Sequence, residues 1–223
     1  MTVKTQYIAP LSLWVVVRRR VLKSGPFIEP AWTGSTQEGI SGPVVFVSRL
    51  LAHMYAYLRN EYHSDDDSAH WKAIPLQDFD LLDHANAIDG PLICMMAYGF
   101  AMETITDVIC VHAPRVRYIP IPFSIPENSG GVTFSFNQWA FDFMRNEWQA
   151  LGLKGYEREL EAVDDLDETA FDRLFQTAVA RLGVCRAPTD KAGPWAAFST
   201  KDDTWIAGYS DEAPPATRSH PLH

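Results

Sequence analysis

Strand patterns and helix patterns occupy separate parts of this sequence. Stretches rich in β-branched and aromatic residues dominate residues 1–136, and apolar residues at helical spacing dominate residues 137–183, before a closing hairpin pattern. Such a division is typical of α+β folds, whereas parallel α/β sheets alternate strands and helices along the chain. We therefore expect an α+β fold with a mixed, largely antiparallel sheet, a strand-rich first part and a helix-rich second part.

The same division bears on domain organisation. We expect a single α+β domain over residues 1–210, in which 1–130 and 131–210 can form two lobes. The last residues, DEAPPATRSHPLH, are polar and rich in proline, so we expect 211–223 to be a disordered tail.

Four apolar stretches predict strands: Leu11–Arg18, Val44–Val47, Leu92–Phe100 and Thr104–His112. Ser48 is placed to cap the helix that follows the second of them, and Pro75 to open another helix that runs to about Ala87. The segment between the first two strands, residues 23–43, is rich in proline and glycine. It is predicted to be a long loop, with a short strand around Phe27–Trp32 as an alternative.

The segment RYIPIPFSIP alternates apolar residues with prolines. Pro120 and Pro122 remove two backbone donors from the same side of this strand. A strand that lacks donors on one side belongs at a sheet edge, so we expect residues 117–126 to form an edge strand.

Three helices are predicted in the second part. Asn137 caps Gln138–Leu151, a charged helix follows around Tyr156–Val163, and the run from Asp164 to Asp167 starts a third that ends near Leu182. Trp195–Thr200 and Thr204–Tyr209 then read as a hairpin across a short polar turn.

Charge excludes two classes of partner. The chain carries 19 Lys+Arg against 28 Asp+Glu, a net charge of −9, which disfavours direct binding to nucleic acid or anionic membrane. The short basic run Arg18–Arg20 does not reverse this balance. An apolar N-terminal stretch too short to span a bilayer and three widely spaced cysteines predict a cytoplasmic protein with reduced thiols.

The acidic stretch ERELEAVDDLDETAFD is the main candidate for a binding surface. In the structural interpretation, the stretch is a solvated helix face, and Asp164–Glu168 complement the dipole at the start of the last long helix. In the functional interpretation, it is a negatively charged patch that attracts a cationic partner and speeds its association. The candidate contacts are Glu157, Glu161, Asp164, Asp165, Asp167 and Glu168.

Two of the seven tryptophans join these candidates. Trp32 lies in the segment rich in glycine and proline, and Trp205 lies beside a charged turn, so neither position requires burial. Exposed tryptophan is a frequent anchor of protein interfaces, although most tryptophans serve as core residues.

No pattern specifies a reaction. His53, His84 and His112 can each act as a base near neutral pH, yet the sequence has no GxSxG element, no phosphate-binding glycine loop and no metal-ligand spacing. The polar run with His63, Asp65, Asp66, Asp67 and His70 reads as a solvated loop or, less simply, as a metal or partner contact. We expect no cofactor and no catalytic residue.

Two stretches are similar to a known pattern. GPVVFVSRLLAHMYAYLRN, a short strand followed by Ser48 and a helix, resembles the strand–FTS–helix element of SseB-like domains, although Phe46-Val47-Ser48 departs from FTS at one residue. WKAIPLQDFDLLDHANAIDGPLICMM resembles the helix and buried strand that follow. The resemblance covers residues 12–100 at most and implies no catalytic residue.

In overall character the chain resembles bacterial immunity proteins that neutralise toxins delivered by type VI secretion or contact-dependent systems. The shared features are small size, acidity, spare aromatic residues and no catalytic constellation. This resemblance implies a non-enzymatic protein that occludes a cognate toxin with a basic surface, of which a nuclease is one example. The alternatives are an enzyme of another family with a pocket between the two lobes, and a regulatory adaptor.

Overall fold

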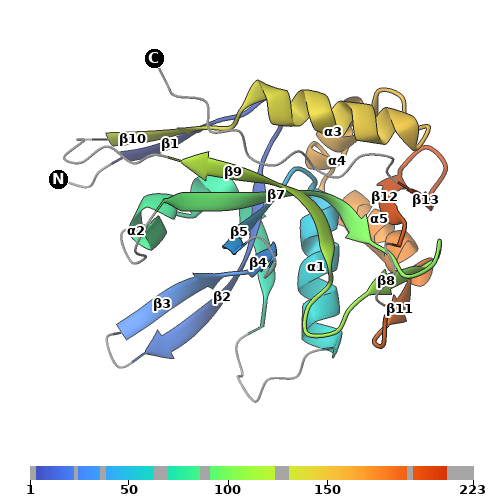
Figure 1. Cartoon of the computed structure of the whole chain (residues 1–223), viewed down its shortest axis with the longest axis horizontal. Helices are drawn as coiled ribbons and strands as arrows, with labels where there is room; N and C mark the ends of the chain where they lie inside the picture. The colour runs from blue at the N-terminus through green and yellow to red at the C-terminus, as the bar shows by residue number, and fades with distance from the viewer. Residues whose placement is uncertain are drawn as a thin grey trace.

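A twisted mixed sheet organises the chain, here described from a computed structural model (Figure 1). The structure describes residues 4–22, 25–35, 39–62, 70–85, 91–123, 131–189 and 193–209. The main sheet has the order β13-β12-β7-β5-β2-β3, with β4 on β5, β6 on β2 and β9 on β7. Its strands are β2 (Trp14–Leu22), β3 (Gly25–Pro30), β4 (Trp32–Ser35), β5 (Ile40–Phe46), β6 (Lys72–Pro75), β7 (Leu92–Ala101), β9 (Val116–Phe123), β12 (Trp195–Ser199) and β13 (Thr204–Gly208).

The pairing confirms the expected fold class. Within this sheet β5 and β7 run parallel, whereas the other described pairings are antiparallel. Two small parallel pairs stand beside it: β1 (Lys4–Ile8) with β10 (Gly131–Ser135), and β8 (Asp107–Ile109) with β11 (Gly183–Cys185). The protein is therefore α+β.

Alternating side chains give the sheet two buried faces. Val15 and Val17 of β2 and Val45 of β5 belong to one core cluster, while Val16 and Val44 belong to the other. Side chains of successive strand residues point to opposite faces, so a continuous run of valines is what a strand covered on both sides requires.

Helices cover both faces. On the first face lie α2 (Leu81–Ala85) and α3 (Gln138–Ala150), and on the second lie α1 (Arg49–Tyr62) and α5 (Glu168–Ala180). The fourth helix, α4 (Tyr156–Asp164), contributes Leu160 to the first core and Val163 to the second. None of the helices in the described part of the chain is long and apolar enough to cross a membrane.

Several sequence predictions are confirmed at individual residues. Ser48 caps α1, since its hydroxyl accepts a hydrogen bond from the Leu51 amide at 3.1 Å, and Asn137 caps α3 through the Trp139 amide at 2.9 Å. β9 pairs with β7 alone among the described strands, with Pro120 opposite Met95 and Pro122 opposite Ile93. The predicted edge strand is therefore at an edge.

The long loop predicted over 23–43 is wrong, whereas the alternative of a short strand around Phe27–Trp32 is confirmed in part by β3. β3, β4 and β5 occupy most of this segment, and Ala31 marks the point where the β2–β3 hairpin gives way to the β4–β5 hairpin. The Ala31 amide donates to the Val16 carbonyl at 2.7 Å, and the Ala31 carbonyl accepts from the Val44 amide at 2.8 Å. Cross-strand pairing thus overrides the turn preference of proline and glycine.

Two further predictions need correction. Residues up to Pro75 form β6, because they pair with β2 from Trp14 to Val17, and a 3-10 turn (Leu76–Asp78) precedes the short α2. The strand predicted over 104–112 shrinks to β8. The polar residues 63 and 65–67 and the tail 211–223 lie outside the described residues.

Candidate functional site

The acidic stretch folds into two helices joined by a tight turn. Gly155 precedes α4 with φ of 69°, a left-handed conformation that glycine adopts at low cost. Asp167 caps α5, because its carboxylate accepts a hydrogen bond from the Ala170 amide at 2.8 Å. Residues 165–167 therefore form a connection between two helix ends, with carboxylates on both sides of it.

Arg49 of α1 stabilises this turn, a role that the sequence did not predict. Its Nη1 donates to the Leu166 carbonyl at 2.9 Å and to the Val163 and Asp164 carbonyls at 3.4 Å. These carbonyls lie at the C-terminal end of α4 and in the turn that follows it. The guanidinium also lies 4.0 Å from the Phe171 ring centroid. A basic residue at the start of α1, far away in sequence, gave no signal of this role.

Three of the predicted contact residues serve the fold instead. Asp164 accepts a hydrogen bond from the Trp14 indole at 3.1 Å, and burial raises the pKa of its carboxyl. Asp167 is the cap of α5. Glu157 forms a two-pronged ion pair with Arg145 of α3 at 2.8 and 2.9 Å.

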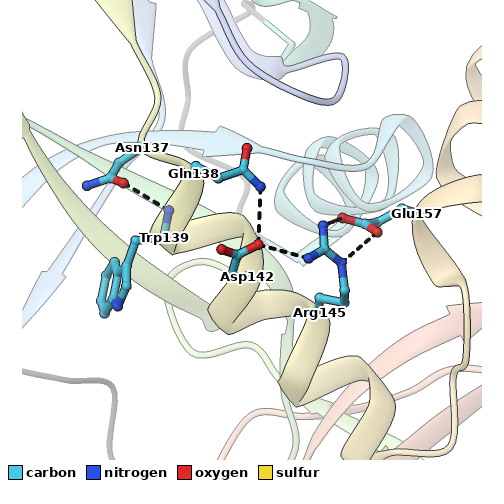
Figure 2. Close-up of polar contacts among 6 residues, drawn as sticks. All are labelled: Asn137, Gln138, Trp139, Asp142, Arg145 and Glu157. Carbon is cyan, nitrogen blue, oxygen red and sulfur yellow. Dashed lines mark hydrogen bonds and ion pairs between the residues drawn. The ribbon is translucent and has the colours of Figure 1, made fainter.

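Figure 2 shows how that ion pair extends along α3. Nη1 of Arg145 also donates to Asp142 at 2.8 Å, and Asp142 accepts from the Gln138 amide at 3.1 Å. This chain of contacts ties α3 to the start of α4. Its hydrogen bonds with both carboxylates, that with Glu157 foremost, raise the pKa of Arg145 further. One carboxylate of the acidic stretch, that of Glu157, is thus already paired with a guanidinium.

The other three predicted carboxylates are exposed. Those of Glu161, Asp165 and Glu168 accept no hydrogen bond and form no ion pair within the described residues. Glu161 and Asp165 are four residues apart, and so are Glu168 and Asp172, which is also exposed; each pair therefore lies on one side of its helix. We call Glu161, Asp165, Glu168 and Asp172 the acidic surface.

The two predicted tryptophans do not join this surface. Trp205 is 8% exposed, packs against Phe100 and Phe198, and donates its indole N–H to the Ala178 carbonyl at 3.0 Å. The expectation of an exposed ring is wrong here, because the hairpin turn leaves this side of β13 facing α5.

Trp32 is 37% exposed, and its ring centroid lies 5.4 Å from that of His84 in α2. α2 covers one face of the sheet and α5 covers the other. Trp32, which packs on α2, therefore lies on the opposite side of the sheet from the acidic residues of α5. Trp139 of α3 is also exposed, at 48%, and its indole points away from the polar contacts in Figure 2.

The three candidate histidines lie in different surroundings. His53 lies between the rings of Trp14 and Phe171, and burial and then the nearby Arg49 lower its pKa to about 4. His84 is buried, and both of its ring nitrogens lack hydrogen-bond partners. His112 is exposed in the loop that follows β8.

A small cavity lies between the sheet and its helices. Its volume is about 10 Å³, enough for a single water molecule. It is lined by Ser48, Leu50, Leu51, Tyr98, Tyr156, Ala197, Phe198 and Trp205. This cavity is too small for a substrate. No group of three or more His, Cys, Asp or Glu side chains able to hold a metal lies within the described ranges.

Compared with known proteins, the chain matches no family model, no curated protein and no solved structure. The arrangement of its own residues is therefore the basis for any functional argument.

Proposed function

We propose that this chain is a non-enzymatic binding protein whose acidic surface recognises a cationic partner. One observation supports this above others: the carboxylates of Glu161, Asp165 and Glu168 are exposed and unpaired within the described residues, on helices that other carboxylates hold in place. Like charges four residues apart on a helix repel each other and slightly destabilise it. The residues of the acidic surface are therefore better placed to attract a partner than to stabilise the fold.

The support beneath the surface makes it rigid. Arg49 fixes the turn between α4 and α5, and the ion pair between Arg145 and Glu157 fixes the other end of α4 to α3. Glu159, which is 6% exposed, accepts hydrogen bonds from the amide and hydroxyl of Thr200, both at 3.0 Å. A surface that does not have to be ordered on binding keeps more of its interaction energy.

In biological terms, we propose an immunity protein that neutralises a cognate antibacterial toxin by covering its cationic active site. A nuclease is a suitable example, because an enzyme that binds nucleic acid presents a cationic cleft. Acidic residues would set the rate and specificity of association, and exposed aromatic residues such as Trp139 would supply apolar contact.

The test has two parts. The tagged full chain should capture one stoichiometric partner from its own cells, and that partner should arrest growth when produced alone but not when produced with this chain. The double variant Glu161→Lys/Asp165→Lys should slow association at least tenfold at low salt and flatten its salt dependence.

A matched control is Asp78→Lys/Asp83→Lys, which makes the same change in charge at exposed residues around the start of α2. Association unchanged by the first double variant, or slowed equally by both, rejects the acidic surface. A partner that is harmless when produced alone rejects the immunity function and leaves a binding protein of another kind.

A further inference from the structure

A group of cations surrounds Trp71 where the C-terminal end of α1 meets β2 and β6. The Cζ atom of Arg59 in α1 lies 3.8 Å from the centroid of this indole, and that of Arg18 in β2 lies 4.7 Å from it. Asn60 fixes Trp71 in turn: its amide donates to the Trp71 carbonyl and accepts from the Trp71 amide, both at 2.9 Å. Two guanidiniums are therefore stacked on a rigid, buried ring.

These two arginines differ in their partners. Nε of Arg18 donates to Glu29 at 2.7 Å, and Arg20 approaches the same carboxylate oxygen at 3.5 Å. Arg59 forms no ion pair within the described residues; its Nη1 donates to the Tyr55 hydroxyl at 3.4 Å, and its Nε is buried without a partner. A charged donor taken out of water without an acceptor is costly, so such a group calls for an explanation.

A further cation adds to the imbalance. Arg186, just after β11, stacks on Tyr62 with its Cζ 4.7 Å from the ring centroid. Burial raises the pKa of the Cys110 thiol, and Arg186 and Arg59 both act against that rise. Both guanidiniums therefore lie close to Cys110. Their positive charges repel each other, and a bound anion would remove this energetic cost.

We propose that Arg18, Arg59, Trp71 and Arg186 form an anion-binding site for a carboxylate or phosphate group. Arg59 is the principal donor, because its guanidinium forms no ion pair within the described residues, and a hydrogen bond from a charged donor to an oxyanion is strong. The proposal is independent of the acidic surface. Arg59 is ten residues after Arg49 in α1, so their backbone positions lie about 15 Å apart along the helix.

The experiment measures thermal unfolding of the full chain and, by calorimetry, its titration with inorganic phosphate and with acetate, at an ionic strength held constant with sodium chloride. Saturable binding with a matching rise in Tm is the expected result. Arg59→Gln should weaken the binding at least tenfold. Arg158→Gln, which removes an exposed arginine of α4, should leave it unchanged.

The two anions separate the sources of the ligand. Stronger binding of phosphate assigns the site to a phosphate ester, and stronger binding of acetate assigns it to a carboxylate. Binding of neither anion, or equal loss in Arg59→Gln and Arg158→Gln, overturns the site. Should Arg59→Gln fail to fold, Arg186→Gln makes the same comparison on a different element, and unchanged binding in that variant is also a contradiction.

Discussion

The two charged regions lie at opposite ends of the same pair of helices. α1 and α5 run side by side in the same direction, since His53 packs on Phe171 and, one turn later, Tyr57 packs on Phe175. The acidic surface includes the first turn of α5, and the cationic cluster surrounds the last turn of α1. Glu168 at the start of α5 and Arg59 near the end of α1 complement the helix dipole, whereas Glu161 and Asp165 lie at the C-terminal end of α4, where a negative charge is unfavourable.

The two charged regions differ in how deeply their charged groups are buried. At the acidic end, Nη1 of Arg49 and the carboxylate of Glu159 are hydrogen-bonded, although Nε of Arg49 is buried without a partner, and the surplus carboxylates project into solvent. At the cationic end, the surplus charge of Arg59 is stacked on a buried ring. Charge can therefore be changed on the acidic surface with little effect on the fold, whereas changes beneath it or at the cationic end should affect stability.

The largest effect is expected for Arg49→Met, which removes the support of the acidic turn. The variant leaves three carbonyls at the end of α4 without their shared donor and removes a buried cation from Phe171. We expect a loss of about 4 kcal/mol in the free energy of unfolding, measured by urea denaturation. Arg158→Met on the exposed side of α4 should change it by less than about 0.5 kcal/mol. A loss below about 1 kcal/mol for Arg49→Met would contradict this role.

Low pH should destabilise the end of the molecule near Arg49, through protonation of His53. The folded chain holds the pKa of His53 at about 4, below the ordinary 6.5, chiefly because of burial and then because of Arg49. The unfolded chain therefore binds a proton first. Stability is complete above pH 6.5 and declines as the pH falls toward 4, by about 3 kcal/mol at most.

His84 adds to this decline in the same direction, because burial lowers its pKa too. The measurement is urea denaturation between pH 7.5 and 4.5. His53→Gln should reduce the slope of stability against pH over this interval. An unchanged slope would show that other groups cause the acid sensitivity.

A smaller effect should distinguish two neighbouring aspartates. Asp167 caps α5, whereas the Asp165 side chain forms no hydrogen bond or ion pair within the described residues. Asp167→Ala should cost about 1 kcal/mol, the usual value for a lost helix cap. Asp165→Ala should be neutral or slightly stabilising, since it removes a negative charge from the C-terminal end of α4. Equal losses for the two, measured by thermal unfolding, would mean that the turn depends on its charge as a whole.

Local signals in the sequence predicted those parts of the fold that local chemistry determines. Ser48 and Asn137 begin helices because their side chains bond to amides within three residues, and Pro120 and Pro122 place β9 at an edge because they lack amide donors. The strand β4 was missed, and β3 was predicted only as an alternative, because their stability comes from partners in β2 and β5, which no local pattern encodes.

The candidate site was predictable in the same partial way. Composition located the acidic stretch, yet it could not separate Asp164, bonded to Trp14 at 3.1 Å, from the exposed Asp165 beside it. Trp14 is remote in sequence from this pair, and so is Arg49. Which carboxylates remain for a partner is decided by such long-range contacts, so it emerges only from the folded chain.

The smallest effect is expected for two glutamates one helical turn apart. Glu157→Gln weakens the ion pair with Arg145 and should cost about 0.5 to 1 kcal/mol. Glu161→Gln removes repulsion from Asp165 and should stabilise the chain by a few tenths of a kcal/mol, about 0.3. The measurement is the urea midpoint of both variants beside the parent chain. A loss of more than about 1 kcal/mol for Glu161→Gln would show that this carboxylate serves the fold and would remove it from the acidic surface. A small gain in stability combined with slower association would show that the chain gives up stability to keep this charge, as binding surfaces commonly do.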